Sequence, residues 1–183
     1  MYPFLEKVAG ATFFCSVYGI LDTTFGPAEI PFFIFPAKGS MKNPYKNTMA
    51  NSFFMSNMSP QKPAFNRGIW KELEALIRYF AITEQKIVVV TGPILPKEKT
   101  ITIGPNQVTV PTHYFKVIFD LTPPRKMIGF ILPNEGSNEP LATFAVTVDA
   151  VEKATGLNFF SRVPKEEQKR LERTISVNAW KGL

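Results

Sequence analysis

The clearest pattern along the chain is a helical repeat of apolar side chains over residues 66–82. Apolar positions recur every three or four residues, as on the buried face of an amphipathic helix. They are Ile69, Leu73, Leu76, Ile77 and Phe80. Asn66 precedes the first of them, and an asparagine side chain there can accept from a free amide of the first turn. We therefore predict a helix over residues 66–82 with an asparagine N-cap.

Short apolar segments bounded by glycine, proline and asparagine follow this helix and predict strands. The predicted strands are residues 86–90, 100–103, 108–110, 114–119, 127–132 and 144–148. Two further helices are predicted, one at residues 149–155 before Gly156 and one at 165–173 after Pro164. Strands in long runs with few helices indicate the α+β class, with a mainly antiparallel sheet.

An uncharged apolar segment, residues 8–21, stands ahead of this pattern. It is shorter than the ~20 residues that a membrane-spanning helix needs. We expect a packed helix over residues 4–21 that contacts a partner protein or a membrane. The chain then divides into residues 1–25, this apolar helix, and residues 26–183, the main domain.

Composition narrows the function classes. With 45% hydrophobic residues in 183, the chain is long enough to bury one core. The net charge of +6 suits a polyanionic partner such as nucleic acid. However, the main basic concentration, at residues 162–173, alternates with glutamates, as on a solvated helix face. A single cysteine, Cys15, and a single histidine, His113, exclude an internal disulfide and any metal site built on two histidines.

Four side chains on the predicted helix are each four residues apart and form one row beside the apolar face. They are Asn66, Trp70, Glu74 and Arg78. Taken alone, the row is ordinary, because Glu74 and Arg78 would form an ion pair and Asn66 would cap the helix. An amide oxygen, a carboxylate and a guanidinium could also hold a hard cation beside a phosphate.

Several short sequence segments, taken together, support a second interpretation of these four residues. They are SNMSPQ at 56–61, FNRGIW at 65–70 with Leu73-Glu74, VTGP at 90–93, VPTHYFKV at 110–117, LPN at 132–134 and TGLNFF at 155–160. In order and spacing they resemble the DNA/RNA non-specific endonucleases, the endonuclease G type, over residues 52–160. The resemblance implies a ββα-metal (His-Me finger) fold, shortened here at its N-terminal side, and a mitochondrial location.

The resemblance also implies roles for the row. Asn66 takes the position of the metal-binding asparagine, Glu74 that of the glutamate that holds the metal's waters, and Arg78 that of a phosphate-stabilising arginine. Asn57 takes the position of another motif asparagine. The family's general base, the histidine of an Asp-Arg-Gly-His motif, has no counterpart, since the sequence there is Phe32-Phe33-Ile34-Phe35. A phenyl ring cannot accept a proton from water.

His113 lies in a segment that the family carries besides its catalytic histidine, so we predict a structural histidine. The sequence thus predicts a pseudo-endonuclease and not an enzyme. It would be a catalytically inactive structural subunit of a larger mitochondrial assembly, with Asn66, Glu74 and Arg78 as vestiges, other subunits as partners and no cofactor. Two alternatives stay open: a magnesium-dependent DNA/RNA endonuclease with residual activity, favoured by the intact row, and a non-catalytic nucleic-acid binder, favoured by the net charge.

Overall fold

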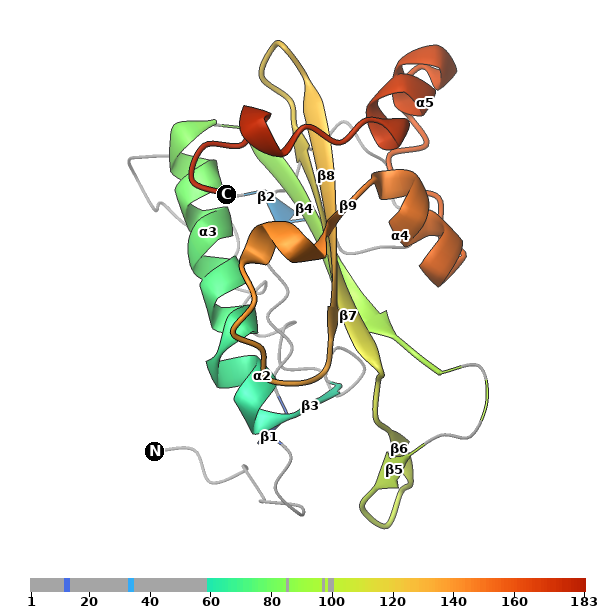
Figure 1. Cartoon of the computed structure of the whole chain (residues 1–183). Helices are drawn as coiled ribbons and strands as arrows, with labels where there is room; N and C mark the ends of the chain where they lie inside the picture. Colours follow the sequence, from blue (N-terminus) through green and yellow to red (C-terminus); the bar gives the residue numbers. More distant parts are fainter. Residues whose placement is uncertain (1–11, 14–32, 35–58, 85, 97, 99–100) are drawn as a thin grey trace, which may run out of the picture.

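The computed structural model describes residues 12–13, 33–34, 59–84, 86–96, 98 and 101–183, and their centre is a five-stranded sheet (Figure 1). Its strand order is β2-β4-β7-β8-β9, and all neighbours in it are antiparallel. These strands are β2 (Phe33–Ile34), β4 (Ile87–Ile94), β7 (His113–Asp120), β8 (Lys126–Pro133) and β9 (Ala145–Val146). Two small pairs lie outside this sheet: β1 (Thr12–Phe13) with β3 (Pro60–Gln61), and β5 (Thr102–Ile103) with β6 (Val108–Thr109). The predicted α+β class with a mainly antiparallel sheet is confirmed.

Helices cover both faces of the sheet (Figure 1). The long helix α3 (Ile69–Thr83) lies on one face, and α4 (Val148–Thr155) and α5 (Lys165–Arg173) lie on the other. The protein has one apolar core on each face of the sheet. Side chains of β7 contribute to both, because successive strand side chains point to opposite faces. Tyr114 and Ile118 pack with α3, whereas Phe115, Val117 and Phe119 pack with α4 and α5.

The local sequence explains the helix ends on the second face. Helix α4 begins one residue earlier than predicted, because the Thr147 hydroxyl caps it by accepting from the Ala150 amide at 3.2 Å. It ends at Gly156, which takes a left-handed conformation with φ of 75°. Helix α5 has the predicted bounds after Pro164. Two 3-10 turns, Leu141–Phe144 and Val177–Ala179, complete the described elements after β8.

The helix predicted over residues 66–82 differs from the observed one at its start. A short helix, α2 (Pro63–Arg67), comes first, and α3 begins only after Gly68. Asn66 therefore lies within α2 and is not an N-cap. A side chain at position 68 would bring its Cβ to 2.6 Å from the Ala64 carbonyl oxygen, so the backbones approach each other more closely than another residue allows. The sequence pattern concealed this break, because apolar spacing continues from Phe65 to Ile69.

The apolar face of α3 is otherwise as predicted. Ile69, Leu73, Ile77 and Phe80 are buried, and only Leu76 is half-buried at the edge of the core.

The apolar helix predicted over residues 4–21 is contradicted where the structure describes it, because Thr12–Phe13 form a strand paired with Pro60–Gln61. Its other residues lie outside the described part of the chain. The division into residues 1–25 and 26–183, and a membrane contact, remain predictions. Among the described helices, none has the length and apolar character needed to cross a bilayer.

Candidate active site

The predicted row is divided between two helices, with Asn66 on α2 and the other three side chains on α3. Asn66 is half-buried on α2, two residues before the break at Gly68, and Glu74 is half-buried on the second turn of α3. Arg78 follows one turn later and is exposed. Because α2 and α3 are separate helices, the row is continuous only from Trp70 to Arg78. The orientation of Asn66 relative to that row depends on the backbone at Gly68.

Glu74 is the most unusual member of the site. No ion pair joins it to Arg78 within the described residues, so the ordinary pairing of carboxylate and guanidinium four residues apart is absent. One of its carboxylate oxygens, Oε1, is buried and has no hydrogen-bond partner in the part of the chain that the structure describes. An unsatisfied buried carboxylate oxygen costs on the order of 1–3 kcal/mol or more. A ligand that donates to this oxygen would recover that cost.

Asn66 is held by a hydrogen bond from its side-chain amide. Its Nδ2 donates to the Oε1 atom of Gln61 at 2.5 Å, and Gln61 is buried. With the amide nitrogen engaged in this bond, the carbonyl oxygen Oδ1 is left as the ligand atom. A neutral amide oxygen is a ligand that magnesium accepts in proteins.

Trp70, between these two residues in sequence, anchors the start of α3 to the sheet. Its ring lies 5.1 Å from the Phe65 ring and 5.5 Å from the Tyr114 ring, measured between centroids. Lys116, fully buried on the central strand β7, places its Nζ 4.2 Å from the centre of the Trp70 ring and 3.5 Å from the Thr91 hydroxyl. A cation against an indole face is an attractive contact, and burial strengthens it. The start of α3 is thus fixed by rings and one buried ammonium.

These features fit a divalent cation. The buried Oε1 of Glu74 lacks a donor among the described residues, and the Oδ1 of Asn66 is left as an acceptor by the bond to Gln61. Asn66 would hold the ion directly and Glu74 would accept from its waters, which is a hard, oxygen-only set suited to magnesium.

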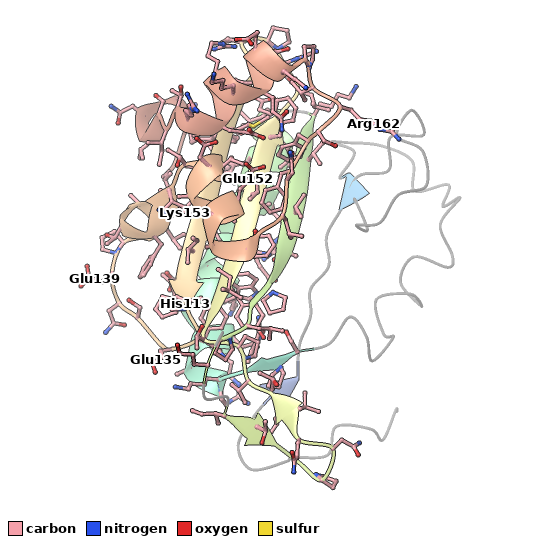
Figure 2. All side chains as sticks on the ribbon, turned by 90° about the vertical axis from the view of Figure 1, so that its right-hand side faces the viewer. His113, Glu135, Glu139, Glu152, Lys153 and Arg162 are labelled. Atoms are coloured by element: carbon pink, nitrogen blue, oxygen red, sulfur yellow. The ribbon has the colours of Figure 1, made fainter. Side chains whose placement is uncertain are left out.

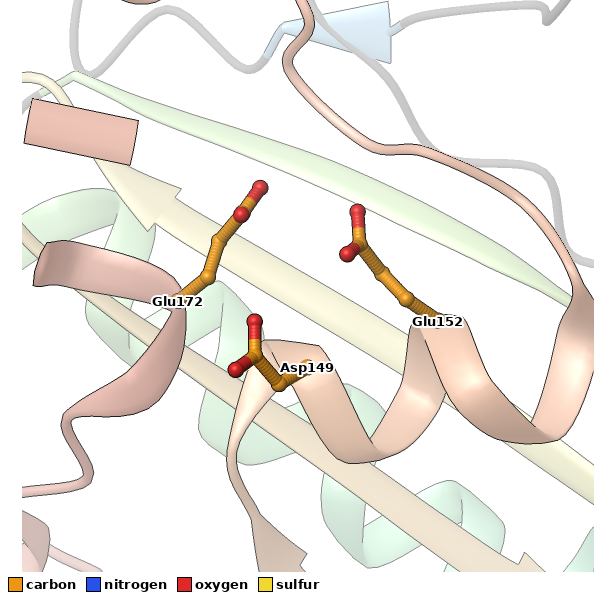
Figure 3. A group of neighbouring side chains, drawn as sticks. All are labelled: Asp149, Glu152 and Glu172. Atoms are coloured by element: carbon orange, nitrogen blue, oxygen red, sulfur yellow. The ribbon is translucent and has the colours of Figure 1, made fainter. Parts of the chain in front are cut away.

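A second group of acidic side chains lies on the other face of the sheet. Asp149, Glu152 and Glu172 bring carboxylate oxygens within 4.8 Å of one another where α4 meets α5 (Figure 3). Each already has a protein partner: Glu152 accepts from the Phe159 amide at 2.7 Å, Glu172 from Gln168 at 2.9 Å, and Asp149 pairs with Arg173 at 3.4 Å. Of these contacts, the Asp149–Arg173 ion pair joins α4 to α5.

The comparisons with known proteins identify the family to which this fold belongs. Residues 37–166 match the family model of the DNA/RNA non-specific endonucleases, so this chain belongs to that family. It is 36% identical to "Nuclease 1, mitochondrial" of Schizosaccharomyces pombe over 69% of this chain and 45% of that protein. It is 37% identical to "Mitochondrial nuclease" of Saccharomyces cerevisiae over 72% of this chain and 46% of that protein. The matched part therefore spans less than half the length of these relatives.

This chain is also similar to a solved structure. The crystal structure of the EndoG/EndoGI complex superimposes with a TM-score of 0.56 and 35% sequence identity, over 63% of this chain and 53% of that one. Together with the antiparallel sheet and α3, this confirms the endonuclease-like fold predicted from the sequence. The mitochondrial location expected from the resemblance is supported, because both fungal relatives are mitochondrial nucleases.

One prediction is overturned. The chain was expected to be a catalytically inactive structural subunit, but the family and the relatives it matches are nucleases. The substitution at Phe32-Phe33-Ile34-Phe35 carried too much weight in that expectation. Of these residues the structure describes only Phe33–Ile34, which form the edge strand β2 against β4. Asn57, the other motif asparagine, lies outside the described residues.

Sequence reasoning missed three buried polar residues of the site: Gln61, Lys116 and Asn134. All three stand inside the segments that carry the family resemblance. Their polarity within apolar surroundings was the available signal, since a polar side chain in a strand or at its end needs a reason to be buried. Their partners could not be read from the sequence, because these are 5 to 74 residues away.

Proposed function

We propose that this chain is a magnesium-dependent nuclease that cleaves phosphodiester bonds of DNA and RNA in mitochondria. The observation that carries the proposal is the buried Oε1 atom of Glu74, which has no hydrogen-bond partner among the described residues. Glu74 lies on α3, and Asn66, whose amide nitrogen is already engaged, lies on the preceding helix α2. A metal-bound water that donates to this oxygen would offset the cost of burying it. Family membership and the nuclease relatives support the same activity.

Each side chain has a separate task in this proposal. A bound magnesium ion would supply positive charge that stabilises the phosphate and the leaving oxygen. Asn66 would place the ion, and Glu74 would orient the waters around it by accepting their protons in hydrogen bonds. Arg78, exposed and without an ion-pair partner among the described residues, is left to contact a phosphate oxygen. The net charge of +6 favours approach of the polyanionic substrate.

The proton acceptor sets the expected rate. The chain's one histidine, His113, begins β7 opposite Pro133 and lies near the Glu135 carboxylate (Figure 2). Its position at a strand end favours a supporting role. Without a positioned general base, reactions are typically ~10²–10⁴-fold slower. We therefore expect slow cleavage, which needs a high enzyme concentration and long incubation to be seen.

The test is cleavage of plasmid DNA and of single-stranded RNA by the pure chain in magnesium or manganese. We expect Asn66→Ala and Glu74→Gln each to abolish the slow cleavage, and His113→Ala to retain most of it. Glu72→Gln is the matched control, because Glu72 is an exposed carboxylate on the same helix. Absence of cleavage by the wild-type chain in both metals, or cleavage that survives both site substitutions, would refute the proposal. Retarded mobility of DNA without cleavage would instead identify a non-catalytic binder.

A further inference from the structure

Asn134, directly after β8, makes an unusual set of hydrogen bonds for an asparagine in a loop. Its side chain is almost fully buried, with 2% exposed. The Oδ1 atom accepts from the Lys62 amide at 2.9 Å, and Nδ2 donates to the carbonyl oxygens of Pro60 at 3.1 Å and Pro111 at 3.0 Å. Its backbone amide also donates to the Thr112 carbonyl oxygen at 2.8 Å. One side chain thus satisfies three backbone groups from two distant segments.

Two of these three bonds lie on either side of Gln61. Asn134 holds the carbonyl group of Pro60 and the amide of Lys62, so the backbone that enters and leaves Gln61 is fixed. The Tyr114 hydroxyl strengthens this hold by donating to the same Pro60 oxygen at 2.9 Å. The Gln61 side chain then accepts from the Nδ2 atom of Asn66. A continuous path of contacts therefore leads from the end of β8 to the amide group proposed to bind the metal.

We propose that Asn134 is a positioning residue of the metal site, acting through Gln61 to keep the Oδ1 atom of Asn66 directed at the cation. This inference rests on the proposed function for the identity of the ligand, but the path of hydrogen bonds does not. Outer partners that orient a ligand residue typically change metal affinity or activity ~10–100-fold when removed. A supporting shell of this kind is how a site built at a helix start reaches a defined geometry.

The competing explanation is that Asn134 has only a structural role, in which its hydrogen bonds hold β3 against the segment before β7. Both explanations predict that Asn134→Ala lowers thermal stability. They differ in coupling, because only the positioning role passes through the Gln61 side chain. Contacts that act along one path give non-additive effects in a double-mutant cycle, whereas independent effects add.

The experiment uses the full chain as wild type, Asn134→Ala, Gln61→Ala and the double variant, with Mn²⁺ as the probe. Mn²⁺ affinity is measured by its paramagnetic relaxation of water protons, below the unfolding temperature of each variant. We expect each single variant to bind Mn²⁺ ~10–100-fold more weakly, and the double variant no more weakly than the poorer single one. Asn158→Ala is the matched control, because Asn158 is exposed and, among the described residues, its side chain accepts one hydrogen bond, from Gln168. Full additivity of the two single effects would overturn the inference.

A second readout needs neither metal nor activity. The side-chain amide signal of Asn66 in a ¹H–¹⁵N spectrum, identified by its loss in Asn66→Asp, should shift and exchange faster in Asn134→Ala. If this signal is unchanged, the positioning role is refuted. If it responds while the wild-type chain neither binds Mn²⁺ nor cleaves, the positioning role stands and the proposed function fails. Should Asn134→Ala not fold, Asn134→Asp carries the test, because it keeps the shape and the bond from Lys62 but loses both donor bonds.

Discussion

Replacing Glu172 by glutamine should change how stability depends on pH. Glu172 is 5% exposed where α5 packs against α4 and the sheet. The pKa of Glu172 is raised from the ordinary 4.5 to about 7, mainly by burial. The hydrogen bond from Gln168 opposes this rise, and the nearby Glu152 and Asp149 carboxylates add to it. A neutral glutamine has nearly the same shape and can keep accepting from Gln168. The substitution therefore removes the charge and little else.

The sign follows from proton binding in the two states. Between pH 4.5 and about 7 the folded protein keeps a proton on Glu172 that the unfolded chain has released. The free energy of unfolding then falls as the pH rises through this window, and the contribution of Glu172 is fully present only below it. A pKa difference of about 2.5, taken as 7 minus 4.5, corresponds to at most about 3 kcal/mol. We expect Glu172→Gln to match the wild type near pH 4 and to be more stable by about 1–3 kcal/mol at pH 8.

Urea unfolding at a series of pH values, followed by circular dichroism, measures this difference directly. Glu166→Gln, an exposed carboxylate on the same helix, is the control and should leave the pH dependence unchanged. If Glu172→Gln is less stable than the wild type at pH 8, the carboxylate is stabilised as an anion and our account of its burial is wrong. Stabilisation of the wild type alone by added Ca²⁺ or Mg²⁺ would point to the same conclusion.

Three further outcomes are expected. Gly68→Ala should destabilise the fold by about 1–3 kcal/mol in thermal unfolding and abolish cleavage, because its Cβ would lie 2.6 Å from the Ala64 carbonyl oxygen. Unchanged cleavage would contradict the role of the break at Gly68. Glu74→Gln should cost no stability in EDTA, since its buried Oε1 atom has no described partner to lose; a clear drop in melting temperature would argue against the metal site. Trp180→Ala should lower the free energy of unfolding by about 3–5 kcal/mol, because the buried Trp180 ring lies 4.8 Å from the Phe80 ring, measured between centroids. The folded variant should still cleave nucleic acid. A loss of cleavage would show that the two ends of α3 are coupled.

The regular parts of this fold are readable from the sequence because their signals are local. The face of α3, the bounds of α5 and the central strands β7 and β8 follow from spacing, proline and turn residues. The start of α3 did not follow, since Gly68 interrupts the backbone without interrupting the apolar pattern. Thr12–Phe13 were also predicted incorrectly, because an uncharged run fits a helix and a paired strand equally well.

The site was only half readable for a different reason. Motif resemblance identified Asn66, Glu74 and Arg78 as a group, but the residues that hold them were invisible. Asn134 reaches Pro60, 74 residues away, and Tyr114 reaches the same oxygen over 54 residues. Such contacts form only once the sheet has formed, so the pattern of apolar and polar residues along the chain does not predict them.

The break at Gly68 has a consequence for protein design. Asn66 and Glu74 are eight residues apart, and on one straight helix that spacing would separate them by about 12 Å along the axis and about 80° around it. Copying the two residues onto an uninterrupted helix of another scaffold would reproduce their residue types and spacing but not their relative position in space. The smallest transferable unit is the short helix α2, the glycine joint and the first two turns of α3, together with a partner that fixes the segment before α2.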